Sequence, residues 1–249
     1  MSQGQITKKE RKTVLENFLS LTTLQGINYV LPVLVLPYLI RVIGTEKFGL
    51  IAFAQALTQF FIIFTDYGFN LSATRKISLS RHEKVKVDRI FSSVMSVKFM
   101  LTLVSFCITI LLVTYVRKFN ADRIIYLLSF GAVIGNALFP TWFFQGQEKM
   151  KFISIINITA GMLYAISIFV LIRRPADYIL APALNSLFFI STGIAGLLTV
   201  FRRFKVKFIL PGYGEIKEEI RSGWNVFVSV LSVNAYTTTR VFADRKSVV

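Results

Sequence analysis

The chain has 249 residues, of which 54% are apolar and only 17% charged, whereas a soluble protein carries about 25% charged residues. It nevertheless holds 29 Lys and Arg against 13 Asp and Glu, a formal net charge of +16. This combination leaves two classes, a nucleic-acid binder with one basic face or a polytopic membrane protein with basic loops. The placement of the charges decides between them.

The counts of cysteine and histidine exclude several kinds of site. One Cys (Cys107) and one His (His82) cannot form a disulfide framework or a Cys/His metal cluster. A Ser-His-Asp site would need His82, which lies in the charged run 80–84 that is typical of a solvated loop. The sequence contains neither of the glycine-rich nucleotide-binding motifs G-x-x-x-x-G-K-S/T and G-x-G-x-x-G. We therefore expect no metal site, no cofactor and no catalytic residues.

Apolar blocks alternate with short charged segments along the whole chain. Each block is close to the roughly 20 residues that cross about 30 Å of hydrocarbon as a helix. The predicted spans are 17–40, 48–70, 92–116, 124–144, 153–172, 179–201 and 223–242. The first block is too long for a signal peptide and is predicted to be a true first helix. The predicted fold class is therefore all-α, with about seven transmembrane helices.

The positive charges follow the ends of these blocks. With the N-terminus inside, the cytoplasmic segments 1–16, 71–91, 145–151 and 202–222 hold 18 Lys and Arg. The opposite loops 41–47, 117–123 and 173–178 hold seven. This excess in cytoplasmic loops is the positive-inside rule, so we expect a cytoplasmic N-terminus and no nucleic-acid partner. Within 202–222, residues 215–222 are predicted to form a short polar helix, either on the membrane surface as a basic hinge or in a solvated linker.

Polar residues recur at helical spacing inside most spans. Gln55, Gln59 and Asp66 share one face of the second span. The other stripes are Gln25 and Asn28; Lys98, Thr102, Ser105 and Thr109; Asn157, Gly161 and Tyr164; Asn185, Thr192 and Gly196; and Asn225, Ser229, Ser232 and Tyr236. Such groups are costly against lipid, so the stripes predict a hydrated central cavity. For any single Ser or Thr, a hydrogen bond between helices is the simpler interpretation. Gly131 and Gly135 predict close helix packing.

Ionisable residues inside spans are the sharper signal, because they are expensive there. Asp66 and Lys98 have similar predicted depth and opposite charge, which predicts an ion pair. The pair could bind a proton or cation, or offer a cation to an anionic substrate. It could equally be structural, with Lys98 extending toward the interface. Arg41 and Arg75 end the first two spans and could meet a phosphate or anchor the membrane interface.

Four strings, in order and at matching spans, carry a family resemblance. They are LQGINY at 24–29, with Pro32 and PYL at 37–39; RVIG at 41–44, with FG at 48–49; DYGFNLSATR at 66–75; and PTWFFQG at 140–146, with EKM at 148–150. They resemble Wzx-type polysaccharide (O-antigen) flippases of the multidrug/oligosaccharidyl-lipid/polysaccharide exporter superfamily. The resemblance runs from about residue 14 to 240.

The resemblance implies a transporter of two six-helix lobes in the bacterial inner membrane. Such a protein moves undecaprenyl-diphosphate-linked oligosaccharide between leaflets by alternating access, in the pathway of lipopolysaccharide or other surface polysaccharides. It implies proton or sodium coupling, and the polysaccharide polymerase and chain-length machinery as partners besides the lipid bilayer. The family positions in this chain are Asn28, Asp66, Asn70, Arg75, Trp142 and Gln145.

The chain is shorter than the 12 to 14 spans that the resemblance implies. We expect residues 17–201 to form the first lobe after a cytoplasmic segment 1–16, 202–222 to be the linker between lobes, and 223–243 to begin a second lobe. Residues 244–249 depart from the pattern and are interpreted as an artefactual tail. Such a fragment is not expected to transport by itself.

Two other functions remain open. One is a different exporter of the superfamily, for drugs or for a lipid-linked peptidoglycan precursor. The less favoured one is a membrane enzyme such as a glycan polymerase, which would need acidic catalytic groups and a large outer loop. The predicted outer loops are about six or seven residues long and carry only Glu46, Asp122 and Asp177.

Overall fold

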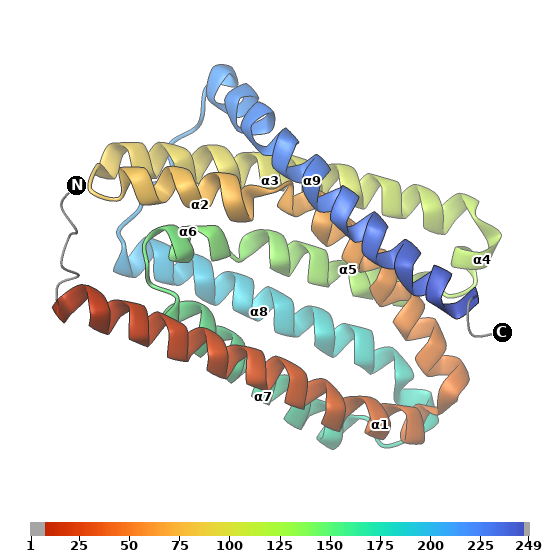
Figure 1. Cartoon of the computed structure of the whole chain (residues 1–249). Helices are drawn as coiled ribbons and strands as arrows, with labels where there is room; N and C mark the ends of the chain where they lie inside the picture. Colours follow the sequence, from red (N-terminus) through yellow and green to blue (C-terminus); the bar gives the residue numbers. More distant parts are fainter. Residues whose placement is uncertain (1–7, 247–249) are drawn as a thin grey trace.

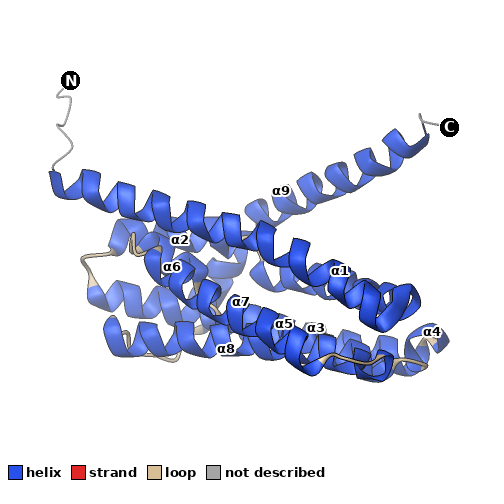
Figure 2. Ribbon diagram, turned by 90° about the horizontal axis from the view of Figure 1, so that it is seen from below, coloured by secondary structure: helices blue, strands red, loops and turns tan. Residues whose placement is uncertain are grey.

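The structure, a computed structural model, describes residues 8–246, with side chains from 30 to 229 and at a few isolated positions outside that range. Within residues 8–246 the chain forms helices and loops and no strand (Figure 2), which confirms the predicted all-α fold class. The elements are α1 (Lys8–Asp66), α2 (Phe69–Ser80), α3 (Lys84–Tyr115), α4 (Arg117–Asn120), α5 (Arg123–Leu138), α6 (Thr141–Gly146), α7 (Lys151–Leu171), the 3₁₀ turn η1 (Pro175–Ile179), α8 (Leu180–Arg203) and α9 (Tyr213–Lys246). They lie side by side in an elongated bundle that α9 crosses obliquely (Figure 1).

Several helices are long and apolar enough to cross a membrane. Five such stretches are found in the described residues: Thr45–Ser80, Lys84–Tyr115, Arg123–Gly146, Lys151–Leu171 and Pro175–Arg203. Val30–Ile43 is a shorter apolar helix. The chain is therefore a multi-pass membrane protein. The predicted spans at 17–40 and 223–242 extend into positions whose side chains lie outside the description.

The first two predicted spans are two arms of α1. They meet at Gly44, whose φ of 82° is not helical. This left-handed conformation suits glycine, which has no Cβ to clash. Figure 1 shows the chain turning sharply there, so that the second arm runs back along the bundle.

The segment 71–91 differs from the prediction of a charged connecting loop. It is almost entirely helical, because α2 ends at Ser80 and α3 begins at Lys84. The apolar residues Phe69, Ala73 and Ile77 recur every four positions and are fully buried, so α2 has one face to pack on the bundle. The basic residues of this segment therefore stand on a helical hairpin.

The linker 202–222 also differs from the prediction. Only 204–212 is non-helical, and α9 begins at Tyr213, so the expected short polar helix continues into the seventh predicted span without a break. Most side chains of 204–212 are exposed, but the segment is tied to α3: Val206 is buried, the Lys207 amide donates to Asp88 Oδ1 (3.1 Å), and the Ile209 amide donates to Ser92 Oγ (2.9 Å). The two acceptors lie about one helical turn apart on α3, and that rise is similar to the length of the two linker residues between the two amides.

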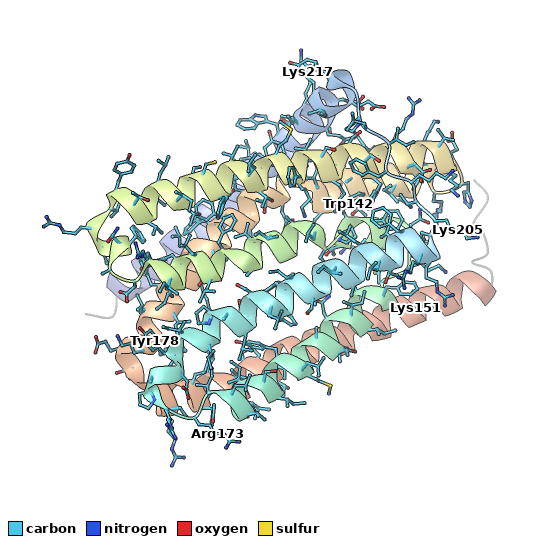
Figure 3. All side chains as sticks on the ribbon, turned by 180° about the vertical axis from the view of Figure 1, so that it is seen from behind. Trp142, Lys151, Arg173, Tyr178, Lys205 and Lys217 are labelled. Atoms are coloured by element: carbon cyan, nitrogen blue, oxygen red, sulfur yellow. The ribbon has the colours of Figure 1, made fainter. Side chains whose placement is uncertain are left out.

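Helices α5 and α8 pack with their backbones in near contact. A Cβ on Gly135 would clash with the backbone of Phe189 and Ile190, and one on Gly131 would lie 2.7 Å from Ser186 Cβ. The close packing predicted from these two glycines is confirmed. At the loop ends of the bundle, Lys151 and Lys205 lie together at one end, and Arg173 and Tyr178 lie at the other (Figure 3).

Candidate functional site

The predicted ion pair between Asp66 and Lys98 is present. Lys98 Nζ lies 2.8 Å from Asp66 Oδ1, and Asn70 Nδ2 donates to Asp66 Oδ2 at 3.3 Å. The Lys98 side chain is only 2% exposed, whereas that of Asp66 is 25% exposed. A buried ammonium group needs such a partner, because its desolvation is otherwise uncompensated. The partly open carboxylate is the accessible side of the pair.

A break in the helix presents Asp66 to Lys98. Asp66 is the last residue of α1, and α2 begins three residues later. Between them Tyr67 and Gly68 both have left-handed backbone conformations, with φ of 43° and 76°. For Tyr67 this conformation costs about 1–2 kcal/mol. Strained backbone of this kind clusters at functional sites, and here it lies next to the charged pair.

A second set of contacts joins α2 to α6. The Thr74 hydroxyl lies 2.7 Å from the Asn70 carbonyl, 3.2 Å from the Trp142 carbonyl and 3.4 Å from Gln145 Oε1. Asn70 and Gln145, which the family resemblance singles out, therefore share Thr74 as a neighbour. Thr74 lies inside the 66–75 motif but is not among the predicted site residues, because the sequence gives no sign that its hydroxyl contacts α6.

Trp142 does not face an open site. Its side chain is fully buried, with its ring 5.7 Å from that of Phe91 and 6.2 Å from that of Phe143. Figure 3 shows it inside the bundle. In this conformation Trp142 packs in the core, and its part in substrate binding or coupling stays a prediction. Trp142 belongs to an aromatic core that includes Phe143 and Phe144, both fully buried.

The remaining predicted residues are not gathered at one site. Arg75 is exposed on α2 and lines a cavity of about 470 Å³ with Lys76 and Ser222. Arg41 is exposed on the first arm of α1, before Gly44. The Asn28 side chain lies outside the described residues. The structure thus brings together Asp66, Asn70 and Lys98, and separately Gln145 with Thr74.

The polar stripes have two different environments. Gln55 and Gln59 of α1, both exposed, line a cavity of about 240 Å³ together with Ser129 and Asn185, and Ser129 Oγ is buried without a hydrogen-bond partner. This arrangement fits the expected hydrated cavity. On α3, by contrast, Thr102, Ser105 and Thr109 each donate a hydrogen bond to the carbonyl four residues earlier, so their hydroxyls are satisfied within one helix, and the cavity-facing interpretation of that stripe stays a prediction.

Comparison with known proteins decides the family. Residues 14–243 match the family described as "Polysaccharide biosynthesis protein". The chain belongs to this family. The match covers all four motifs that carry the resemblance, including the Asp66–Arg75 segment and Lys98 of the ion pair.

Two curated relatives are similar over most of the chain. A protein of Escherichia coli (strain K12) named "Putative O-antigen transporter" is 31% identical over 222 residues, which is 89% of this chain and 54% of the relative. A protein of Shigella dysenteriae with the same name is 30% identical over 224 residues, 89% of this chain and 56% of the relative. The chain therefore spans about half the length of these relatives. No solved structure matches it.

Proposed function

We propose that the chain is part of a bacterial inner-membrane exporter that moves an undecaprenyl-diphosphate-linked oligosaccharide, such as an O-antigen repeat unit, to the outer leaflet. The observation that carries the proposal is the family match over 14–243, together with relatives named as transporters rather than enzymes. Residues 17–201 would form one lobe and 223–243 begin another, with the N-terminus in the cytoplasm. Alternating access would then require the two parts to change their relative position.

The cavity beside Arg75 is the proposed contact for the diphosphate. Arg75 supplies an exposed guanidinium group on α2, and Ser72 and Ser222 line the same cavity from α2 and α9. Lys76 also lines this cavity, but its ammonium group pairs with Glu218 and Glu219. A guanidinium group can bind two phosphate oxygens at once, so Arg75 is the proposed donor. The amides of Gln55, Gln59 and Asn185 are proposed to meet sugar hydroxyls.

The Asp66–Lys98 pair is the proposed coupling element. Asp66 precedes Tyr67, whose ring stacks on Phe227 of α9 at a centroid distance of 4.9 Å. A Cβ on Gly223 of α9 would lie 2.8 Å from the Tyr67 ring, so the crossing is tight. A proton or cation at Asp66 would loosen its bond with Lys98 and, through Tyr67, bias the position of α9.

Complementation tests this function. The complete gene, expressed in a strain that lacks its own O-antigen transporter, is expected to restore surface polysaccharide. A parallel strain depleted of its exporter for lipid-linked peptidoglycan precursor is expected not to be rescued. Absence of surface polysaccharide with the protein verified in the membrane, or rescue of the second strain alone, would refute the proposed cargo.

A further inference from the structure

A carboxyl group is buried where α9 crosses α2. The Glu219 side chain is 6% exposed, and its Oε1 accepts a hydrogen bond from Lys76 Nζ at 2.9 Å. Its Oε2 is buried without a hydrogen-bond partner. The neighbouring Glu218 is 74% exposed and lies 3.3 Å from the same Lys76 Nζ. Two carboxylates therefore compete for one ammonium group.

The other charges at this junction are already matched. The junction lines a cavity of about 460 Å³ between α2, α3 and α9, with Lys86, Arg89 and Glu215 on its wall. Arg89 pairs with Glu215 at 3.6 Å, and Lys86 pairs with Glu83 at 2.7 Å. Glu218 and Glu219 thus share one ammonium group and leave one surplus negative charge, which one added proton on the buried Glu219 would neutralise.

Burial favours the neutral form of this group. Desolvation raises the pKa of Glu219 above its ordinary value, and the negative charge of Glu218 adds to the rise, although Lys76 and the Ser222 hydroxyl act in the opposite direction. Proton binding favours whichever arrangement of α9 gives Glu219 the higher pKa. If α9 lifts away, the carboxyl becomes hydrated and its pKa falls back, so protonation favours the docked arrangement. Docking is strengthened as pH falls through the raised pKa and weakened above it.

We propose that Glu219 is a proton-binding site that controls the docking of α9 on α2 and α3. The position of the site supports a conformational role, since four residues further on α9 crosses the helix break at Tyr67 and Gly68 in close contact through Gly223. A metal ion is a poorer ligand here. One free carboxyl oxygen supplies too few ligands, and the described residues contain no group of three His, Cys, Asp or Glu placed to hold a metal. The inference is independent of the transported cargo.

Infrared titration of the 249-residue chain in lipid nanodiscs tests the site directly. We expect the infrared band of a protonated carboxyl group to persist at pH values above those at which a glutamate ordinarily loses its proton. Glu219→Gln should remove this band. Glu218→Gln is the matched control: it should keep the band and lower its midpoint, because a competing anion is gone. Lys76→Gln should raise the midpoint. A band that survives Glu219→Gln, or the absence of any such band in the parent protein, would overturn the proposal.

Distances between spin labels test the coupling to docking. Labels at Arg203→Cys and Lys217→Cys, in a Cys107→Ser background, lie on exposed positions of α8 and α9. The distance distribution is expected to narrow as pH falls through the midpoint found by infrared, and Glu219→Gln should hold the narrow distribution at every pH. Identical pH responses of the parent and Glu219→Gln would contradict the coupling. A midpoint that moves with sodium concentration would assign the site to a cation and overturn the proton assignment.

Discussion

Lys98 Nζ lies 2.8 Å from Asp66 Oδ1, and this contact ties the interior of α3 to the last residue of α1. The two residues are 32 positions apart, and α2 and the first half of α3 lie between them. Asp66 is followed by a strained break that packs against α9 through Tyr67, so we expect a change in the pair to affect the position of α9. The pair is thus a structural bond and a candidate for coupling.

Single and double substitutions of the pair should separate these two roles. Lys98→Ala leaves Asp66 without its cation, and Asp66→Asn leaves Lys98 buried without a counter-charge; each should destabilise the fold by about 3 kcal/mol. The double variant Asp66→Asn with Lys98→Met removes both charges and should recover most of that stability. All three are expected to impair export, measured as surface polysaccharide at matched membrane levels of the complete protein. Full export by the double variant would show that the pair is structural only.

Trp142 should behave as a core residue. Trp142→Ala removes a fully buried ring and is expected to lower the free energy of unfolding by about 3–5 kcal/mol, measured by thermal unfolding in detergent. Trp142→Phe keeps the aromatic contact with Phe91 and should cost much less. If Trp142→Ala left stability unchanged but abolished export, a direct substrate role would replace this assignment.

Gly135 should not tolerate even one methyl group. Gly135→Ala would force the α5 and α8 backbones apart and cost about 3 kcal/mol, seen as a lower unfolding midpoint. Gly49→Ala is the control, since a Cβ there meets nothing within 4 Å and alanine favours helix by about 0.5–1 kcal/mol. Equal effects of the two substitutions would argue against the close packing of α5 and α8.

The linker should be released by removing its acceptors on α3. Asp88→Ala or Ser92→Ala takes away one hydrogen bond of about 1 kcal/mol, so the amides of Lys207 and Ile209 respectively should exchange with deuterium roughly fivefold to tenfold faster. Ser93→Ala is the matched control, because the Ser93 hydroxyl donates to Arg89 within its own helix. Faster exchange in the Ser93 variant alone would contradict the assignment.

The fold class and the main charged pair could be predicted because each leaves a local signal. The length of each apolar block indicates a membrane span. Two opposite charges predicted at the same depth indicate an ion pair, because an unpaired charge there is costly. The α2 helix was missed because its polar composition reads as a loop, and its packing face is only three residues, Phe69, Ala73 and Ile77. The continuous α9 was missed because polar and apolar halves of one helix look like separate elements.

The contacts of Glu219, Asp88 and Thr74 could not be predicted from the sequence. Each contact joins residues 68 to 143 positions apart in the chain. The local sequence pattern does not indicate which donor pairs with which acceptor. The burial of Trp142 was also beyond reach, because a tryptophan near a span end is equally typical of an interface anchor.

The most direct test of the central claim is transport by the complete purified protein in vesicles. Fluorescent undecaprenyl-diphosphate-linked oligosaccharide is placed in one leaflet, and a membrane-impermeant lectin reports its arrival in the other. With the protein present, the labelled lipid is expected to reach the other leaflet faster than in protein-free vesicles. With Asp66→Asn at equal protein content, the rate is expected to fall back to the protein-free rate. Arrival at the protein-free rate with correctly folded protein would contradict it.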